Sequence, residues 1–341
     1  MIPDDGLNLG VTMLNDFKAD EVALATGHVP DGSNANKIPD GLEYLLVRRT
    51  EENANLDSLF TTVYEPYNNE RYIAELSAVP ITVRAEDAGK LGEKDAAKTV
   101  KVVRKDGNVD YIVYATNNQA VYTVTDGDVS FAFRGFVGVY SVDASGKALR
   151  NYILDGDIIG NPSEVYPYGA YTGAVANFNK DLNTNNIIYI QTEDKIDLDK
   201  LAGRWIYVDN DGVENAAYEI RSGQYTEDGL LALDIGMTTL IRNFVDTNDF
   251  TKGYVYNIAA GQTLSIPLSY VSDGAHTCSG GTATCAEPAV CQCGKYHGEK
   301  TPTTTLAVLS FAMPQKQQMQ RMATPAIPTA RAAMRCCKPA L

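Results

Sequence analysis

The chain has 341 residues and a formal net charge of −14 at pH 7. This length allows one large β-domain with a sizeable core and small appendages. Residues 301–341 hold five of the 29 basic residues and no acidic one, so residues 1–300 carry 24 basic and 43 acidic groups, a net charge of −19. A body this acidic repels phosphate backbones, which argues against nucleic-acid binding. No stretch of 18 apolar residues occurs, so no transmembrane segment is expected.

The first residues enter a strand-like pattern almost at once. They lack the basic and apolar regions of a signal peptide, so we expect a chain cut from a longer protein. Residues 7–26 alternate weakly and predict two strands with a break near Asn15. Residues 59–64 predict another strand, which Pro66 is expected to end because proline cannot donate a ladder hydrogen bond. The next strand should start near Arg71.

The dipeptide Asp-Gly occurs nine times, often between strand-like runs. It suits the two-residue type I′ hairpin, in which both central residues need positive φ. Repetition of strand, tight turn and strand predicts an all-β fold, an antiparallel β-sandwich of two stacked sheets over residues 1–271. Residues 194–203 predict one short helix ending at Gly203. Trp205 is expected to anchor the core, and residues 209–212 to form a hairpin turn rather than a calcium loop.

Two segments also carry a resemblance to a known family. Leu42-Glu-Tyr-Leu-Leu-Val-Arg-Arg49 and the run from Leu56 to Leu76, which contains Ser-Leu-Phe-Thr-Thr-Val-Tyr-Glu-Pro-Tyr, resemble the signature of the C-terminal β-domain of heparinase II/III-type polysaccharide lyases. Weaker similarity continues to residue 271. The resemblance implies a secreted or cell-surface bacterial protein whose partners are an acidic, glycosaminoglycan-like polysaccharide and a helical toroid domain.

Lyases of this family cleave uronate-containing glycans by β-elimination, which needs a base, an acid and a group that neutralises the uronate. The resemblance implies that these groups come mostly from an N-terminal α/α toroid and its junction with the sheet domain, and this chain contains no such toroid. None of its three histidines (His28, His276 and His297) matches a family catalytic motif. We therefore assign no catalytic residue and expect a supporting, glycan-contacting domain that is inactive alone.

Two groups of tyrosines are candidate substrate-binding residues. The first flanks the central turn and could face the toroid: Tyr64, Tyr67 and Tyr72. The second forms a loop whose rings could stack on sugars: Tyr166, Tyr168 and Tyr171. Ordinary packing of aromatic rings within strands and loops is the alternative for both groups.

All six cysteines follow residue 277. Residues 272–298 form a Cys-rich module that resembles those appended to surface proteins of Gram-positive bacteria, and residues 299–341 read as a disordered tail. Four thiolates could hold zinc, with His276 or His297 as substitutes: Cys278, Cys285, Cys291 and Cys293. Disulfides, if the protein is secreted, and free thiols remain open. The second hypothesis for the function is a cell-surface β-sandwich that binds carbohydrate or protein, with the Cys-rich module as a spacer.

Overall fold

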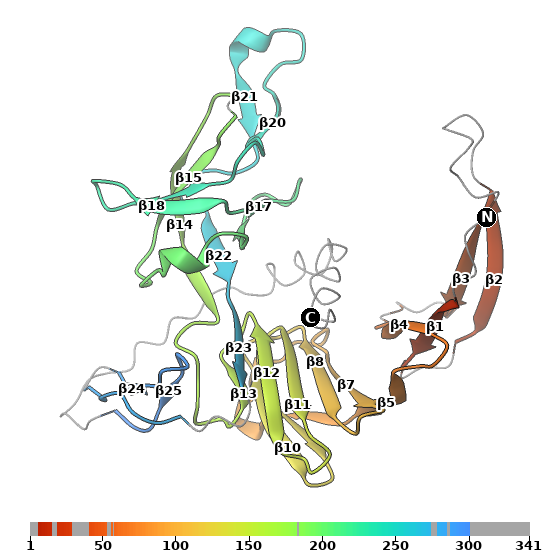
Figure 1. Cartoon of the computed structure of the whole chain (residues 1–341). Helices are drawn as coiled ribbons and strands as arrows, with labels where there is room; N and C mark the ends of the chain where they lie inside the picture. The colour runs from red at the N-terminus through yellow and green to blue at the C-terminus, as the bar shows by residue number, and fades with distance from the viewer. Residues whose placement is uncertain are drawn as a thin grey trace. The chain divides into compact units, whose positions relative to one another are not determined.

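A computed structural model describes residues 6–15, 19–28, 41–52, 56, 58–182, 184–273, 278–284 and 287–300. It is nearly all β, and every strand pair described in register is antiparallel, which confirms the predicted fold class (Figure 1). The described residues contain three short 3₁₀ helices: η1 (Ala85–Lys90), η2 (Leu198–Lys200) and η3 (Phe250–Lys252). The chain divides into two compact units, residues 1–78 and 79–341.

The first unit consists of paired strands with little interior. β1 (Leu7–Met13) pairs with β4 (Thr62–Asn68), β2 (Glu21–His28) pairs with β3 (Gly41–Arg48), and β5 (Ile73–Val79) leads into the second unit. The break between β1 and β2 confirms the predicted pair of strands. The expected end at Pro66 is wrong, because Pro66 lies inside β4 opposite Leu9. In its two-stranded sheet β4 has only one neighbour, so the missing donor need not break a ladder.

The second unit begins with a β-sandwich built from two sheets. One sheet has the order β13-β10-β9-β6, and the other contains β23-β12-β11-β8-β7. Their bounds are β6 (Ile81–Val83), β7 (Ala97–Arg104), β8 (Val109–Ala115), β9 (Tyr122–Asp126), β10 (Val129–Arg134), β11 (Val137–Val142), β12 (Ala148–Leu154), β13 (Ile158–Gly160) and β23 (Ser269–Asp273).

Alternation along these strands produces the sandwich core. In β8, Tyr111, Val113 and Ala115 are buried while the residues between them are less so, as a half-buried strand requires. They belong to one apolar cluster with Phe133 of the opposite sheet, which is fully buried. Burying a side chain of that size contributes about 1.5–3 kcal/mol.

The remaining strands of the second unit form one seven-stranded sheet of order β17-β16-β22-β14-β15-β19-β18. The two ends of this order, β17 and β18, are separated in the chain by only Ile220 and Arg221, so the sheet must curl until its edges approach. Its core lies inside the curl. The bounds are β14 (Ala170–Phe178), β15 (Ile187–Gln191), β16 (Trp205–Val208), β17 (Ala217–Glu219), β18 (Ser222–Tyr225), β19 (Leu231–Asp234) and β22 (Thr263–Pro267).

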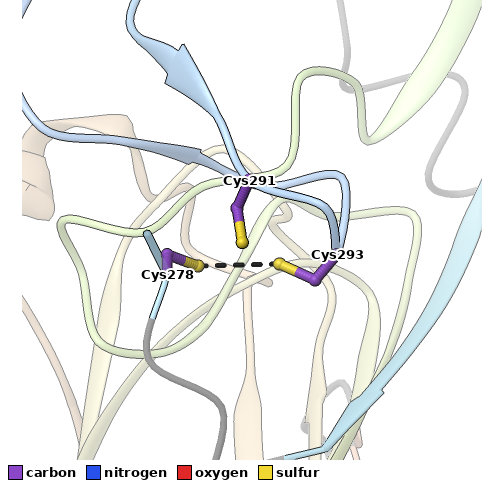
Figure 2. Close-up of side chains that lie close together, drawn as sticks. All are labelled: Cys278, Cys291 and Cys293. Atoms are coloured by element: carbon purple, nitrogen blue, oxygen red, sulfur yellow. Dashed lines mark hydrogen bonds between the residues drawn. The ribbon is translucent and has the colours of Figure 1, made fainter. Parts of the chain in front are cut away.

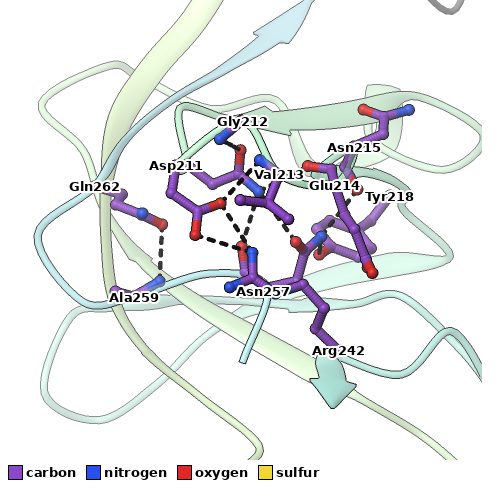
Figure 3. A network of polar contacts seen from close by, with 11 residues as sticks. Asp211, Gly212, Val213, Glu214, Asn215, Tyr218, Arg242, Asn257, Ala259 and Gln262 are labelled. Atoms are coloured by element: carbon purple, nitrogen blue, oxygen red, sulfur yellow. Dashed lines mark hydrogen bonds and ion pairs between the residues drawn. The ribbon is translucent and has the colours of Figure 1, made fainter. Parts of the chain in front are cut away.

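Two small hairpins complete the described strands. β20 (Ile241–Phe244) pairs with β21 (Tyr254–Tyr256), and β24 (Ala289–Val290) pairs with β25 (Tyr296–His297). A polar network, buried at Asn257 and exposed at Asp211, extends from the base of the β20–β21 hairpin to the β16–β17 loop (Figure 3). There Asn257 donates to Asn215 O and to the Tyr218 hydroxyl, both at 2.9 Å. The guanidinium of Arg242 binds both carboxylate oxygens of Asp211 at 2.9 Å. Residues 209–212, predicted as a hairpin turn, begin the longer loop that joins the paired strands β16 and β17.

The tight turns differ from the predicted type I′ geometry. Among the described residues, only Asn69 and Asp155 have positive φ without being glycine, so Asp155, which precedes Gly156, is the one described aspartate of an Asp-Gly pair that adopts it. In the turn from Arg104 to Asn108, Gly107 N donates to Arg104 O and Arg104 N donates to Asn108 O. This is a three-residue loop in which glycine alone takes the left-handed conformation. Glycine takes this position because the left-handed conformation imposes a steric cost on aspartate that glycine does not have.

Two further expectations need correction. The helix predicted over residues 194–203 is only the 3₁₀ turn η2, whose first turn is capped by Asp197 accepting from Asp199 N. Trp205 does not anchor the core, because 42% of it is exposed while Ile206 and Val208 next to it in β16 point inward. The strand was predicted correctly, but its inward face begins one residue later, so Trp205 lies outside.

Candidate metal centre

The turn of the β24–β25 hairpin brings two cysteines together. Cys291 N donates to Lys295 O and Gly294 N donates to Cys291 O, both at 2.9 Å. This is the same three-residue turn as at Gly107, with Gly294 in the left-handed conformation. The spacing Cys-x-Cys therefore suits this turn, in which Cys293 is folded back beside Cys291.

The Cys-rich segment is attached to the sandwich by backbone hydrogen bonds. Val165, in the loop after β13, forms an isolated antiparallel bridge with Tyr296 of β25. Val165 N donates to Tyr296 O at 3.2 Å, and Tyr296 N donates to Val165 O at 2.6 Å. The bridge places Glu164 next to the cysteines, although it is 114 residues away from Cys278 in the chain.

Three sulfur atoms converge at this point. The Sγ atoms of Cys278, Cys291 and Cys293 all lie within 4.8 Å of one another, and those of Cys278 and Cys293 are 3.6 Å apart (Figure 2). With Zn–S bonds of about 2.3 Å, a tetrahedral site places its sulfurs about 3.8 Å apart. The three cysteines can therefore bind a metal ion with little rearrangement.

The carboxylate of Glu164 is the nearest further oxygen ligand. Cys278 Sγ donates to Glu164 Oε2 at 3.4 Å. Burial, followed by the hydrogen bonds with Cys293 and Glu164, raises the pKa of the Cys278 thiol. In the metal-free protein this thiol stays protonated at neutral pH, and a bound cation would displace the proton because metal binding selects the thiolate.

The other predicted ligands have different positions. Cys285 and His276 lie outside the described residues. His297 Nε2 lies 2.9 Å from Gly280 O, so this ring nitrogen is occupied by a backbone carbonyl. The side chain of His28 also lies outside the description, which leaves His297 as the histidine whose surroundings are known.

The six candidate tyrosines occupy unlike positions. Tyr64 and Tyr72 are more than half exposed and Tyr67 is half-buried. Tyr166 is buried, with its ring stacked 4.0 Å from Tyr270. Tyr171 is also buried and accepts a hydrogen bond from Asp197 N, whereas Tyr168 is half-buried beside it. In the second unit, packing and hydrogen bonding therefore hold the rings of Tyr166 and Tyr171 in place.

No family model, curated protein or solved structure matches this chain. Within the described residues, no helix has both the length and the apolar character needed to cross a membrane.

Proposed function

We propose that the chain is a non-catalytic recognition module of a bacterial cell surface, in which a zinc ion fixes the Cys-rich segment against the β-sandwich. The convergence of three cysteine sulfurs beside Glu164 carries this proposal. Zinc is favoured because thiolates select it and because a site closed by four protein ligands is typical of structural zinc. The resemblance of the Cys-rich segment to modules of Gram-positive surface proteins supports the location.

The ligand set would consist of Cys278, Cys291 and Cys293 with either Glu164 or Cys285 as the fourth. Zinc there would join the loop after β13 to the β24–β25 hairpin, which otherwise share the Val165–Tyr296 bridge and the ring contact of Lys295 with Tyr166. The role is structural, so we expect no turnover by this chain.

The metal content of the purified full chain tests this proposal. We expect one zinc per chain by elemental mass spectrometry, and loss of that zinc in Cys291→Ser. The matched controls are Cys336→Ser and Cys337→Ser, which remove thiols outside the proposed site and should keep the metal. Glu164→Gln and Cys285→Ser, compared directly, identify the fourth ligand. A metal-free chain whose cysteines resist alkylation until reduced would show disulfides and overturn the zinc site.

A second proposal is a supporting wall of a heparinase II/III-like polysaccharide lyase. It is favoured by the exposure of Tyr64 and Tyr72, which lie on the segment that resembles the family signature. In this case the chain would contact an acidic polysaccharide together with a separate helical toroid. Absorbance of unsaturated uronates, measured on a panel of glycans, should remain flat with this chain alone. Product formation without a toroid would contradict the claim that the chain lacks the catalytic groups.

A further inference from the structure

A small hollow of about 200 Å³ lies beside the candidate metal centre. Its walls come from the strands β11, β12, β13 and β23, the loop after β13 and the turn between β24 and β25. Cys293 and Glu164 belong to both the hollow and the metal centre. Pockets for drug-sized ligands occupy about 300–1,000 Å³, so this one fits a single small unit.

Asn151 contributes a buried amide oxygen without a partner. The residue is 5% exposed, and its Oδ1 is buried and makes no hydrogen bond with the described residues. Its Nδ2 lies 3.4 Å from the position that a Cβ atom on Gly160 would take, and both residues line the hollow. Because the oxygen and nitrogen of an amide are told apart only by their partners, either can face a ligand. An unpaired buried amide oxygen at such a place indicates a missing partner.

Lys295 contributes a buried cation. It is 5% exposed, and its Nζ lies 5.2 Å from the centre of the Tyr166 ring. Within the described chain no carboxylate lies at ion-pair distance from it, although lysine is rarely buried unless paired. The carboxylates of Glu164 and Asp273 line the same hollow, so its charged groups sum to a negative value.

Sugar hydroxyls match this combination of groups. A hydroxyl both donates and accepts, so it can accept from Lys295 and donate to a carboxylate or to the Asn151 oxygen. The wall at Tyr140 is an aromatic ring stacked 4.3 Å from Phe131, which offers an apolar surface to the carbon face of a sugar. The hollow contains two carboxylates and one ammonium group, and this excess of negative charge disfavours the binding of an acidic sugar.

We propose that this hollow binds one neutral sugar unit of a glycan. The inference rests on the proposed recognition function and names its ligand class. Asn151 and Lys295 bind the hydroxyls, and the Cys-rich segment closes the site by carrying Lys295.

The test follows amide signals of the ¹⁵N-labelled full chain by NMR during titration with methyl glycosides. The neutral probes are the methyl glycosides of glucose, mannose and galactose, and the acidic probe is methyl glucuronide. We expect saturable shifts at Asn151, Gly160, Ser272 and Lys295 with at least one neutral probe. Asn151→Leu and Lys295→Met should each weaken this binding at least tenfold. Asn185→Leu, at an exposed asparagine, is the matched control and should leave it unchanged.

Other results would overturn the site. If no neutral probe shifts these amide signals, the hollow holds only water. If methyl glucuronide binds more tightly than the neutral probes, the ligand is an acid. Unchanged spectra outside the hollow show that the two variants are folded. Suppose that glycan binding by the zinc-loaded chain is unchanged in Asn151→Leu but lost in Trp205→Ala. The proposed recognition function then stands, and this hollow is not the glycan site. If the chain binds neither a glycan nor zinc, both the proposed recognition function and this sugar site are wrong.

Discussion

Glu65 shows how a single carboxylate organises the segment that resembles the lyase signature. It is 4% exposed, and it accepts hydrogen bonds from Arg71 Nε at 2.6 Å and from the backbone N–H groups of Tyr72 and Ile73 at 2.7 Å. Burial opposes ionisation, but the hydrogen bonds from Ile73, Arg71 and Tyr72 outweigh it and lower the pKa of Glu65. The glutamate in this motif therefore holds the turn between β4 and β5.

We expect Glu65→Gln to destabilise this turn by about 1–3 kcal/mol, because a charged acceptor is replaced by a neutral one in a buried place. Hydrogen exchange at the amides of Tyr72 and Ile73 should become about ten- to a hundredfold faster. Since the folded pKa is depressed, the stabilisation exists above the unfolded pKa and disappears as the pH falls through the folded pKa. Glu75→Gln, at an exposed position of β5, is the control. Equal protection in both variants would contradict this role.

Asp155 has the opposite electrostatic balance. It takes a left-handed conformation with φ of 49°, and Asn118 Nδ2 donates to its carboxylate at 2.9 Å. Burial raises the pKa of Asp155 to about 6, while the hydrogen bond from Asn118 only partly offsets that effect. The ionised form therefore costs stability at neutral pH.

Asp155→Asn should stabilise the protein at pH 7, by on the order of 2 kcal/mol. Asparagine tolerates the left-handed conformation and can still accept from Asn118. Because the folded pKa is raised, the advantage should be complete above pH 6 and vanish below the unfolded pKa of about 4. Urea unfolding across this pH range measures it. Asp143→Asn should have the opposite sign, since hydrogen bonds from Ser145 lower the pKa of Asp143. If Asp155→Asn is less stable than the unmodified chain at pH 7, the raised pKa of Asp155 is refuted.

At the scale of elements, β11 depends on a residue without a side chain. A Cβ atom on Gly138 would lie 2.6 Å from Phe133 Cε2 and 3.0 Å from Ile159 Cδ1, both in the opposite sheet. The absence of a side chain in β11 therefore makes the room that Phe133 fills, and the two sheets approach closely there.

We expect Gly138→Ala to destabilise the sandwich by about 1–3 kcal/mol, the usual cost of overpacking a core. Gly89→Ala is the matched control, because nothing lies within 4 Å of its added Cβ atom and its φ is not left-handed. That variant should be neutral or more stable by about 0.4–1 kcal/mol. Thermal unfolding monitored by circular dichroism compares them, and equal midpoints would show that β11 can move away from β10.

At the scale of the whole molecule, the two units differ in how they are stabilised. The buried apolar clusters of the described chain contain no residue before Val79. More than half of the large apolar residues with high exposure fall in the first unit, including Leu24 at 74% and Leu7 at 67%. Two-stranded sheets without a covered face are marginal in water.

A fragment of residues 1–78 should therefore lack a cooperative unfolding transition, whereas residues 79–300 should retain one. Calorimetry of the two fragments and of the full chain tests this. The expected result is a transition of the longer fragment at nearly the midpoint of the full chain. A cooperative transition of residues 1–78 alone would show that this unit has a core of its own.

The sequence by itself determined the all-β antiparallel class, because alternating apolar residues and turn glycines are local signals. It also placed β1, β2 and the strand at Trp205, and it identified Cys278, Cys291 and Cys293 as candidate metal ligands. It failed at Pro66, at the turn type and at the inward face of β16, where the neighbouring strands decide what a local pattern becomes.

Tertiary structure alone decided the surroundings of the three candidate metal ligands. Glu164, Asn151 and Lys295 come from three separate segments, and no spacing in the sequence relates them. They meet because Val165 pairs with Tyr296 and because Asn151 of β12 lies opposite Ser272 of β23 and beside Gly160, the last residue of β13. Long-range strand pairing creates such sites, and its partners cannot be read from local residue patterns.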